Sequence, residues 1–457
     1  MPTTADTIVA LSTPPGRSGI GVIRLSGTRA LEITRALVQD NQFTPEPKHV
    51  TLKSLCDPQT GEVLDRALIT YFKSPHSFTG EDVVELSCHG SPVLLRQLVD
   101  AILVQNARPA GPGEFTLRAL SHGRLNLSQA EAVRDIIDAR TNAAARQAAR
   151  QLKGELSSRL QPMKDSLLDI IVPLESSLEF VEDDLPEFSI RELSLQLSTL
   201  AEQIGALAAT FRSGRLLKDG LKVALAGRPN VGKSSVFNSL LSNDRAIVTD
   251  LPGTTRDSLS ETVSINGIPV LLTDTAGVRS SQDVVESLGV ERTLRAVAEA
   301  DLVVVILDGS EPLTREDEDV LAQVSPHLHL IAINKNDLKS FSLNGLEHLT
   351  DNSWRVVAVS AKTCAGLDDL RNAILEPFEA TEIHETGLLI TDARHFDLLR
   401  RAQDSLLSSC ELLKQRASEE LVLIGLYNAL SFLGQITGET TPEDVLSQIF
   451  ATFCIGK

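Results

Sequence analysis

A glycine-rich octapeptide offers the most specific chemistry in this sequence. Residues 227–234 read GRPNVGKS, which matches the pattern G-x-x-x-x-G-K-[ST]. A strand-like apolar run precedes the octapeptide, and a helix-like run follows it. In such a loop backbone amides surround phosphate groups, Lys233 reaches the β- and γ-phosphates, and Ser234 binds Mg²⁺. We therefore predict a nucleoside triphosphate site. Its residues in this loop are Asn230, Val231, Gly232, Lys233, Ser234 and Ser235.

Four further motifs follow in the order in which GTPases carry them: GTTRD (253–257), DTAG (274–277), NKND (334–337) and SAK (360–362). The Asp337 carboxylate can accept hydrogen bonds from N1–H and the 2-amino group of guanine, and adenine offers neither donor. The set therefore indicates GTP, with Asp274 in the Mg²⁺ shell. The further residues predicted to bind GTP are Asp274, Thr275, Ala276, Gly277, Asn334, Lys335, Asp337, Ser360, Ala361 and Lys362.

The residue directly after DTAG is Val278, where many Ras-like switches carry a glutamine that orients the attacking water. Valine cannot perform that task. Arg256 and Arg279 could neutralise charge between the β- and γ-phosphates, but both also fit solvated surface arginines. The motifs alone therefore leave open which groups supply these two functions.

Three regions of the chain, which differ in their sequence pattern, are expected to form the domains that position these motifs. Residues 1–122 alternate short apolar runs with Gly and Pro turns, which predicts an α+β domain. Residues 123–215 and 381–457 are helix-like and are expected to pack together as one bundle domain. Residues 216–380 alternate strands and helices, as a parallel, doubly wound α/β domain does. The predicted fold is multidomain, with a Ras-like P-loop GTPase domain inserted into an all-α domain.

The composition argues against several classes of protein. A formal net charge of −18 repels phosphate backbones, and an aromatic share of 4% disfavours stacking platforms for single-stranded nucleic acid. The five cysteines include no C-x-x-C pair, which disfavours a zinc site or a disulfide framework and favours a reducing compartment. Neither a signal peptide nor a run of about 18 apolar residues is evident. We expect a soluble, cytoplasmic protein without a membrane span.

Longer strings distinguish this chain among GTPases: DTIVALSTPPGRSGIGVIRLSG, SFTGEDVVELSCHG, PGEFTLRAL, GRLNLSQAEAV, GRPNVGKSS, AIVTDLPGTTRD, DTAGVR, GVER and the terminal FCIGK. In combination they resemble the MnmE family of tRNA-modification GTPases, also called TrmE, over essentially the whole chain.

The resemblance implies how the chain manages without the glutamine and the arginine. In the family a K⁺ ion bridges the phosphates and lets the two GTPase domains of a homodimer close face to face. The K⁺ ligands would be Asn230, Thr249, Leu251 and Thr254. Thr249, Thr254 and Thr255 would also contact GTP, and Thr255 would join Ser234 as a Mg²⁺ ligand. The catalytic residue that orients water would be Glu286.

The resemblance also implies that residues 1–122 form a dimerising domain that binds a one-carbon tetrahydrofolate, either 5-formyl- or 5,10-methylene-tetrahydrofolate. The implied folate residues are Arg24, Glu85, Arg124 and Lys457. Arg124 stands where the family usually has lysine, so its donor geometry differs. The terminal CIGK would reach the pocket and bring Cys454 close to the one-carbon donor, where the cysteine could pack or react.

The function implied by the resemblance is shared with MnmG, a partner that contains FAD, in a heterotetramer. Together they add an aminomethyl or carboxymethylaminomethyl group to C5 of the wobble uridine (position 34) of certain tRNAs. The tRNA would lie mainly on MnmG, with Arg140, Arg146 and Arg150 either a local contact or a solvated helix face. A regulatory or ribosome-assembly GTPase without folate chemistry, and a dimerising scaffold with a slow GTPase, are the alternatives.

Overall fold

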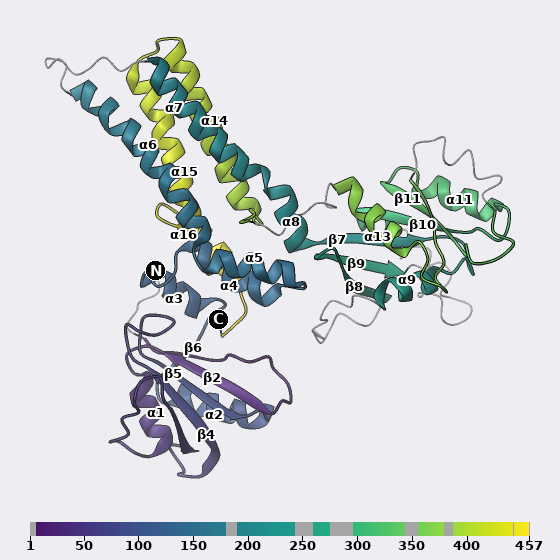
Figure 1. The fold of residues 1–457 in the computed structure, drawn as a ribbon. Helices are drawn as coiled ribbons and strands as arrows, with labels where there is room; N and C mark the ends of the chain where they lie inside the picture. Colours follow the sequence, from purple (N-terminus) through teal and green to yellow (C-terminus); the bar gives the residue numbers. More distant parts are fainter. Residues whose placement is uncertain are drawn as a thin grey trace. The chain divides into compact units, whose positions relative to one another are not determined.

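The computed structural model describes residues 6–179, 190–242, 259–274, 296–342, 355–378, 387–441 and 443–456 (Figure 1). The chain divides into two compact units. The first unit comprises Met1–Arg134, Leu152–Gln161 and Leu430–Lys457, and the second comprises Asp135–Gln151 and Pro162–Ala429.

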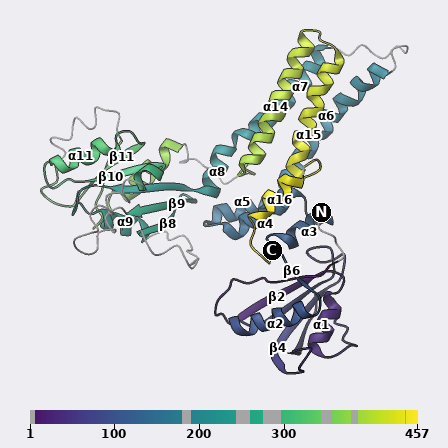
Figure 2. The same cartoon turned by 180° about the vertical axis from the view of Figure 1, so that it is seen from behind.

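The first unit is built on a six-stranded sheet with the strand order β3-β4-β5-β2-β1-β6. Neighbouring strands are antiparallel, except that β1 and β6 are parallel. The helices α1 and α2 cover one face of the sheet, and their apolar side chains form one core with those of the strands (Figure 2). The elements are β1 (Ile8–Leu11), β2 (Ile20–Ser26), α1 (Ala30–Val38), β3 (Val50–Cys56), β4 (Val63–Phe72), β5 (Val83–His89), α2 (Pro92–Val104), β6 (Arg108–Pro109) and α3 (Glu114–Ser121).

The carboxyl end of the chain returns to this first unit. The short helix α16 (Glu443–Ala451) precedes the tail, and Phe450 and Phe453 pack with Leu127 and Ala130 in a small apolar cluster. A single antiparallel bridge then pairs Ile455 with Pro112. The apolar cluster therefore anchors the tail where it meets the loop before α3.

The second unit contains a helical bundle in which α7 and α14 pack along their length. The α14 side chain of Gln403 donates to the carbonyl of Ala201 on α7 at 3.2 Å, and Tyr427 of α15 donates to Glu175 of α6 at 2.8 Å. This unit holds α5 (Asn142–Leu152) apart from its last residue, α7 (Ile190–Ala209), α8 (Phe211–Asp219) and α14 (Ala393–Lys414). The residues of α4 (Leu127–Asp138), α6 (Glu155–Glu179) and α15 (Glu419–Thr437) are divided between the two units.

The helix α15 is long and apolar enough to cross a membrane by length and composition alone. Its side chains at Val422, Leu426 and Ala429 are fully buried, as expected of a core helix in a bundle. The hydrogen bond from Ser409 of α14 to the carbonyl of Val422 supports the same interpretation.

The second unit also holds a second six-stranded sheet, with the order β12-β11-β10-β7-β9-β8. The pairs from β12 to β9 are parallel, whereas β8 is antiparallel to β9. The elements are β7 (Leu221–Ala226), α9 (Lys233–Leu241), β8 (Leu259–Ile265), β9 (Ile268–Asp274), β10 (Leu302–Asp308), α11 (Arg315–Val324), β11 (His329–Asn334), β12 (Val356–Ala358), α13 (Leu367–Leu375) and the 3₁₀ turn η1 (Glu376–Phe378).

The antiparallel edge strand differs from the parallel sheet that the sequence predicts. Asn266 and Gly267 connect β8 to β9, and both adopt positive φ, at 49° and 84°. Two such residues form the tight turn whose twist suits a β-hairpin. The dipeptide Asn-Gly therefore accounts for the hairpin that the expectation of a parallel sheet overlooks.

Two segments connect the second sheet to the bundle, and they lie side by side. The amide of Ile390 donates to the Thr210 hydroxyl at 3.0 Å. Lys218 of α8 makes ion pairs with Asp135 at 2.9 Å and with Asp392, the N-cap of α14, at 3.3 Å. Burial alone would raise the pKa of Asp392, but His395 and Lys218 lower it to about 2. These contacts fix both connections to the bundle.

Candidate functional sites

The phosphate loop adopts a backbone that only glycine fits at two positions. Gly227 has φ 147°, and an added Cβ would lie 2.4 Å from the carbonyl oxygen of Ile306. Gly232 has φ 97°, and its Cβ would lie 2.3 Å from the Asn334 side chain. The loop leaves β7 and enters α9 at Lys233, so its amides gather at a helix N-terminus.

The Lys233 ammonium is held inside the loop. It is buried, and its Nζ donates to the carbonyls of Gly227 and Arg228, each at 2.7 Å. Arg228 in turn donates to Asp317 at 3.1 Å and to Glu311 at 2.8 Å. These bonds hold the loop around the buried Lys233 ammonium, and this lysine is the residue that reaches the phosphates in the motif.

Ser234 and Asp274 lie together at the end of β9. The Ser234 hydroxyl donates to Asp274 Oδ2 at 2.7 Å, and Asp274 is fully buried. A hydroxyl ligand with a carboxylate directly behind it is the oxygen-rich arrangement that Mg²⁺ accepts beside phosphates. The pair therefore fits Mg²⁺, as the sequence predicts.

Asn334 joins the phosphate loop to the base-recognition loops. Its Nδ2 donates to the carbonyl of Val231 at 2.9 Å, and its Oδ1 accepts from the amide of Ala361 at 3.1 Å. Asp337 accepts from Ser360 Oγ at 2.6 Å, and this bond lowers the pKa of Asp337. The carboxylate is therefore ionised at neutral pH and can accept hydrogen bonds from guanine.

Asp308 is a supporting residue that the sequence analysis misses. It ends β10 and pairs with Lys335 of the NKND motif. Burial would raise the pKa of Asp308, but hydrogen bonds from Lys335 and Ser310 hold it below its ordinary value. Lys335 itself adopts a left-handed backbone conformation, with φ 68°. The sequence feature that could have revealed Asp308 is its position at the end of a buried strand.

The structure brings together the predicted phosphate, Mg²⁺ and guanine residues that it describes. Asn230 adopts φ 65° and is exposed at the tip of the phosphate loop. Several predicted residues lie outside the described part of the chain. They are Thr249, Leu251, Thr254, Thr255, Arg256, Thr275, Ala276, Gly277, Val278, Arg279, Glu286 and Lys457.

A second cluster of predicted residues lies on the first sheet. Arg24 of β2 is directly opposite Glu85 of β5, and its Nε donates to Glu85 Oε1 at 2.9 Å. The Arg24 guanidinium carbon lies 5.7 Å from the ring centroid of Phe78 and 5.6 Å from that of Phe115. Both distances lie within the range of cation–π attraction.

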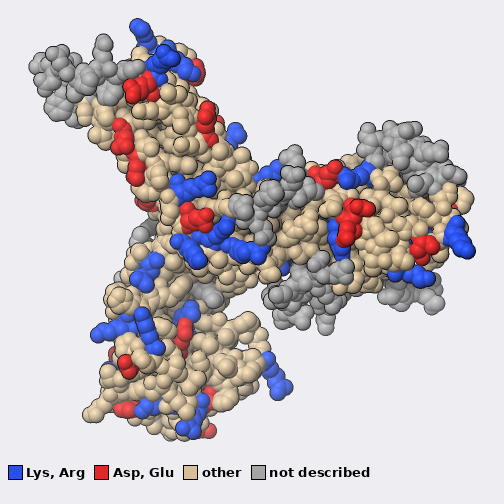
Figure 3. Space-filling view, in the orientation of Figure 1, with Lys and Arg blue, Asp and Glu red and all other residues tan. Residues whose placement is uncertain are grey.

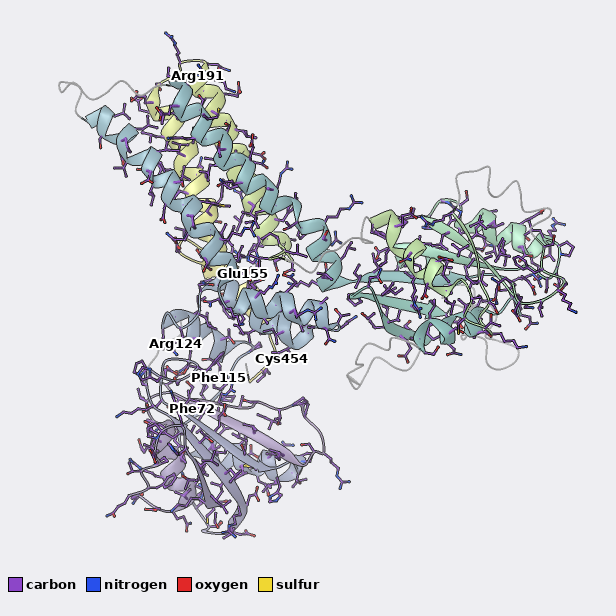
Figure 4. The ribbon with its side chains drawn as sticks, in the orientation of Figure 1. Phe72, Phe115, Arg124, Glu155, Arg191 and Cys454 are labelled. Atoms are coloured by element: carbon purple, nitrogen blue, oxygen red, sulfur yellow. The ribbon has the colours of Figure 1, made fainter. Side chains whose placement is uncertain are left out.

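The carboxyl-terminal tail completes this cluster. The carbonyl of Gly456 accepts from Ser12 Oγ at 3.2 Å and from Arg24 Nη1 at 3.4 Å. The amide of Gly113 donates to the carbonyl of Cys454 at 3.3 Å, while the Cys454 side chain is exposed (Figure 4). Arg124, labelled in the same figure, is exposed and close to Gly80, on the loop that carries Phe78. A cation, a carboxylate and two aromatic rings thus converge beside the tail.

Comparison with known proteins decides the family. A model described as "GTP-binding protein TrmE N-terminus" matches residues 7–124, and one described as "MnmE helical domain" matches residues 127–454. The chain belongs to the MnmE family of tRNA modification GTPases. The MnmE of Koribacter versatilis is 43% identical over 456 residues, covering 99% of both chains. That of Aquifex aeolicus is 40% identical over 451 residues, covering 98% of this chain and 99% of its own.

Among solved structures, the G domain of the T. maritima FeoB iron transporter is 28% identical, with a TM-score of 0.27. It covers 34% of this chain and 97% of its own. Era from Aquifex aeolicus is 25% identical and has a TM-score of 0.29. The match covers 41% of this chain and 67% of the Era chain. The MnmE membership confirms the predicted family and the GTP hydrolase activity, and the described elements confirm the fold class.

We predict that Asp337→Asn lowers GTP affinity about 100-fold, because guanine loses two charge-assisted hydrogen bonds. The variant should instead favour xanthosine triphosphate, whose C2 carbonyl can accept from the new amide. Competition binding with GTP, ATP and xanthosine triphosphate measures the change. Asp319→Asn, at an exposed carboxylate of α11, is the matched control. An unaltered nucleotide preference in Asp337→Asn would contradict the guanine assignment.

Proposed function

We propose that this MnmE-family chain is a K⁺-dependent GTPase that acts with MnmG on wobble uridine 34 of certain tRNAs. The product carries an aminomethyl or carboxymethylaminomethyl group at C5. When bound, a 5-formyl- or 5,10-methylene-tetrahydrofolate supplies the one-carbon unit. The observation that carries the proposal is the convergence of Arg24, Glu85 and the Gly456 carbonyl on one face of the first sheet.

The residues of this cluster suit a folate. A folate presents glutamate carboxylates at one end and a pterin with hydrogen-bond donors at the other. Arg24 supplies a cation held between Phe78 and Phe115, and Glu85 supplies a carboxylate acceptor. Arg124 and Lys457 would add cations. The exposed Cys454 thiol would lie near the one-carbon unit, where it would either pack against the folate or react with it.

The nucleotide site would drive conformational change rather than bond formation at uridine. Lys233, Ser234 and Asp274 would hold the β- and γ-phosphates and Mg²⁺. Asn230, with its exposed left-handed position in the phosphate loop, would bind K⁺ together with Thr249, Leu251 and Thr254. Thr255 would bind Mg²⁺, and Glu286 would orient the attacking water. K⁺ would let two GTPase domains of a homodimer close on each other.

The charge of the chain fits a division of labour with MnmG. A net charge of −18 disfavours tRNA binding by the chain as a whole, so the tRNA and the FAD would lie mainly on the partner. On the face drawn in Figure 3, however, Lys and Arg side chains gather around α5, the helix that carries Arg146 and Arg150. With Arg140 they would form a local tRNA contact. We place this activity in the cytoplasm, where free cysteines stay reduced.

We predict that the full chain binds 5-formyltetrahydrofolate in titration calorimetry and that Arg24→Ala weakens binding at least about tenfold. The reason is that the arginine is the cation for which the two rings and Glu85 are arranged. Arg66→Ala, which removes an exposed arginine from β4, should leave folate affinity unchanged. GDP binding reports on the integrity of the second sheet. Absence of folate binding by the wild-type chain would favour a ribosome-assembly GTPase instead.

We also predict that GTP turnover is at least about tenfold faster in KCl than in NaCl at equal ionic strength. The reason is that K⁺ would neutralise charge between the phosphates, as an arginine does in other GTPases. Steady-state phosphate release measures the effect, and GTP affinity in both salts separates binding from catalysis. Equal turnover in the two salts would contradict the K⁺ assignment at Asn230.

A further inference from the structure

The first unit contains a buried arginine that neither the GTP site nor the proposed folate contacts include. Arg118 of α3 is only 2% exposed and donates to three carboxylates. Its Nη1 lies 3.1 Å from both oxygens of Glu81, and its Nη2 lies 2.6 Å from Asp6 and 3.0 Å from Glu114. Removing a guanidinium from water costs several kcal/mol, roughly, even when it is paired. Apolar side chains of the same volume could fill the space as stably, so packing alone does not explain the ion network.

The bond from Arg118 to Glu81 ties α3 to the loop at residues 77–81. Glu81 also accepts from the Ser26 hydroxyl at 2.6 Å, and its carbonyl accepts from Ser77 at 2.5 Å. Ser26 and Thr79 are 2.7 Å apart through their hydroxyl oxygens. Every polar group named here is buried, so the conformation of this loop depends on the network.

The two elements that Arg118 joins carry the two rings beside Arg24. Phe78 belongs to the loop at residues 77–81, and Phe115 belongs to α3, one turn before Arg118. The bond between Arg118 and Glu81 therefore links the segments that carry these rings, and Phe115 is also held by packing with Ile8, Ala10 and Ala110. A change in the separation of the rings would free the Arg24 guanidinium from its position near Glu85.

The same network shapes the surface that receives the tail. Glu114 accepts from Arg118, from Arg108 and from the amide of Gly111 at 2.8 Å. The last bond fixes the turn from Gly111 to Gly113, whose final amide donates to the Cys454 carbonyl. Burial would raise the pKa of Glu114, but bonds from Arg108, Gly111 and Arg118 lower it, so this carboxylate remains charged.

We propose that Arg118 is a positioning residue for folate binding. It holds both aromatic walls of Arg24 and the turn that docks the tail in a single arrangement before the ligand arrives, and pre-organisation of this kind raises affinity. The proposal rests on the folate function proposed above. Arg118 itself contacts no ligand in this account, because its side chain is buried and bonded to the three carboxylates.

The test uses the full-length chain with Glu81→Gln, which removes the charge that links α3 to the loop and keeps the side-chain shape. We expect the dissociation constant for 5-formyltetrahydrofolate to rise about tenfold or more. Glu32→Gln is the matched control, because it makes the same change in the exposed Arg29–Glu32 pair of the same unit. Arg118→Lys, which keeps the charge but not the fork of donors, should weaken binding as well.

Hydrogen–deuterium exchange without folate supplies a readout that does not depend on the proposed ligand. We expect Glu81→Gln to speed exchange selectively in peptides spanning residues 75–82, 110–117 and 452–456, with the strands of the sheet unchanged. Uniformly faster exchange across the unit would show a merely structural role and overturn the proposal. Unchanged exchange with unchanged folate affinity would overturn it too. If the wild-type chain binds no folate, the proposed folate function is wrong. The exchange pattern of Glu81→Gln then still tests whether Arg118 positions these segments.

Discussion

The return of the carboxyl-terminal tail to the first strands of the chain is the constraint on which the proposed folate site depends. One backbone carbonyl, that of Gly456, accepts from Ser12 and from Arg24, which lie more than 400 positions earlier in the sequence. Gly456 has φ 96°, and a Cβ there would lie 2.5 Å from the carbonyl of Leu11, so only glycine allows the approach. Burial of Phe450 and Phe453 stabilises the docked tail and offsets the entropy of ordering it. A complete site on the first sheet therefore requires both ends of the chain.

In the nucleotide site, too, a few polar side chains connect loops that are far apart in the sequence. Asn334 bonds to the phosphate loop through Val231 and to the SAK loop through Ala361. A movement of the phosphate loop would consequently shift Asn334 at the end of β11 and the SAK loop, which is predicted to contact guanine. The ion pairs of Lys218 then tie the helix that leads into this sheet to the bundle helices α4 and α14. These bonds offer a physical route by which nucleotide turnover could act on the bundle.

The sequence predicts what depends on local pattern. The octapeptide at 227–234 required a glycine-lined turn between a strand and a helix, and the structure contains that turn. Only the pairing of β2 with β5 shows that Arg24 and Glu85 stand opposite each other, because they lie 61 positions apart in the sequence. The network of Arg118 escaped prediction because only Glu114 stands at the i,i+4 spacing of a helical ion pair. Asp6 and Glu81 lie far away in the sequence, and no local pattern marks them as partners of Arg118. The partners of Arg228 escaped likewise, since Asp317 belongs to the capping box of a distant helix and Glu311 lies in the loop before that helix.

The central claim is that this GTPase and its folate site serve the modification of wobble uridines in tRNA. The most direct measurement is mass spectrometry of nucleosides from tRNA of cells in which the gene has been deleted. The account predicts loss of the aminomethyl-type groups at C5 of uridine 34, with recovery when the wild-type gene is restored. Wobble uridines that keep these groups at the wild-type level in the deleted strain would contradict the account.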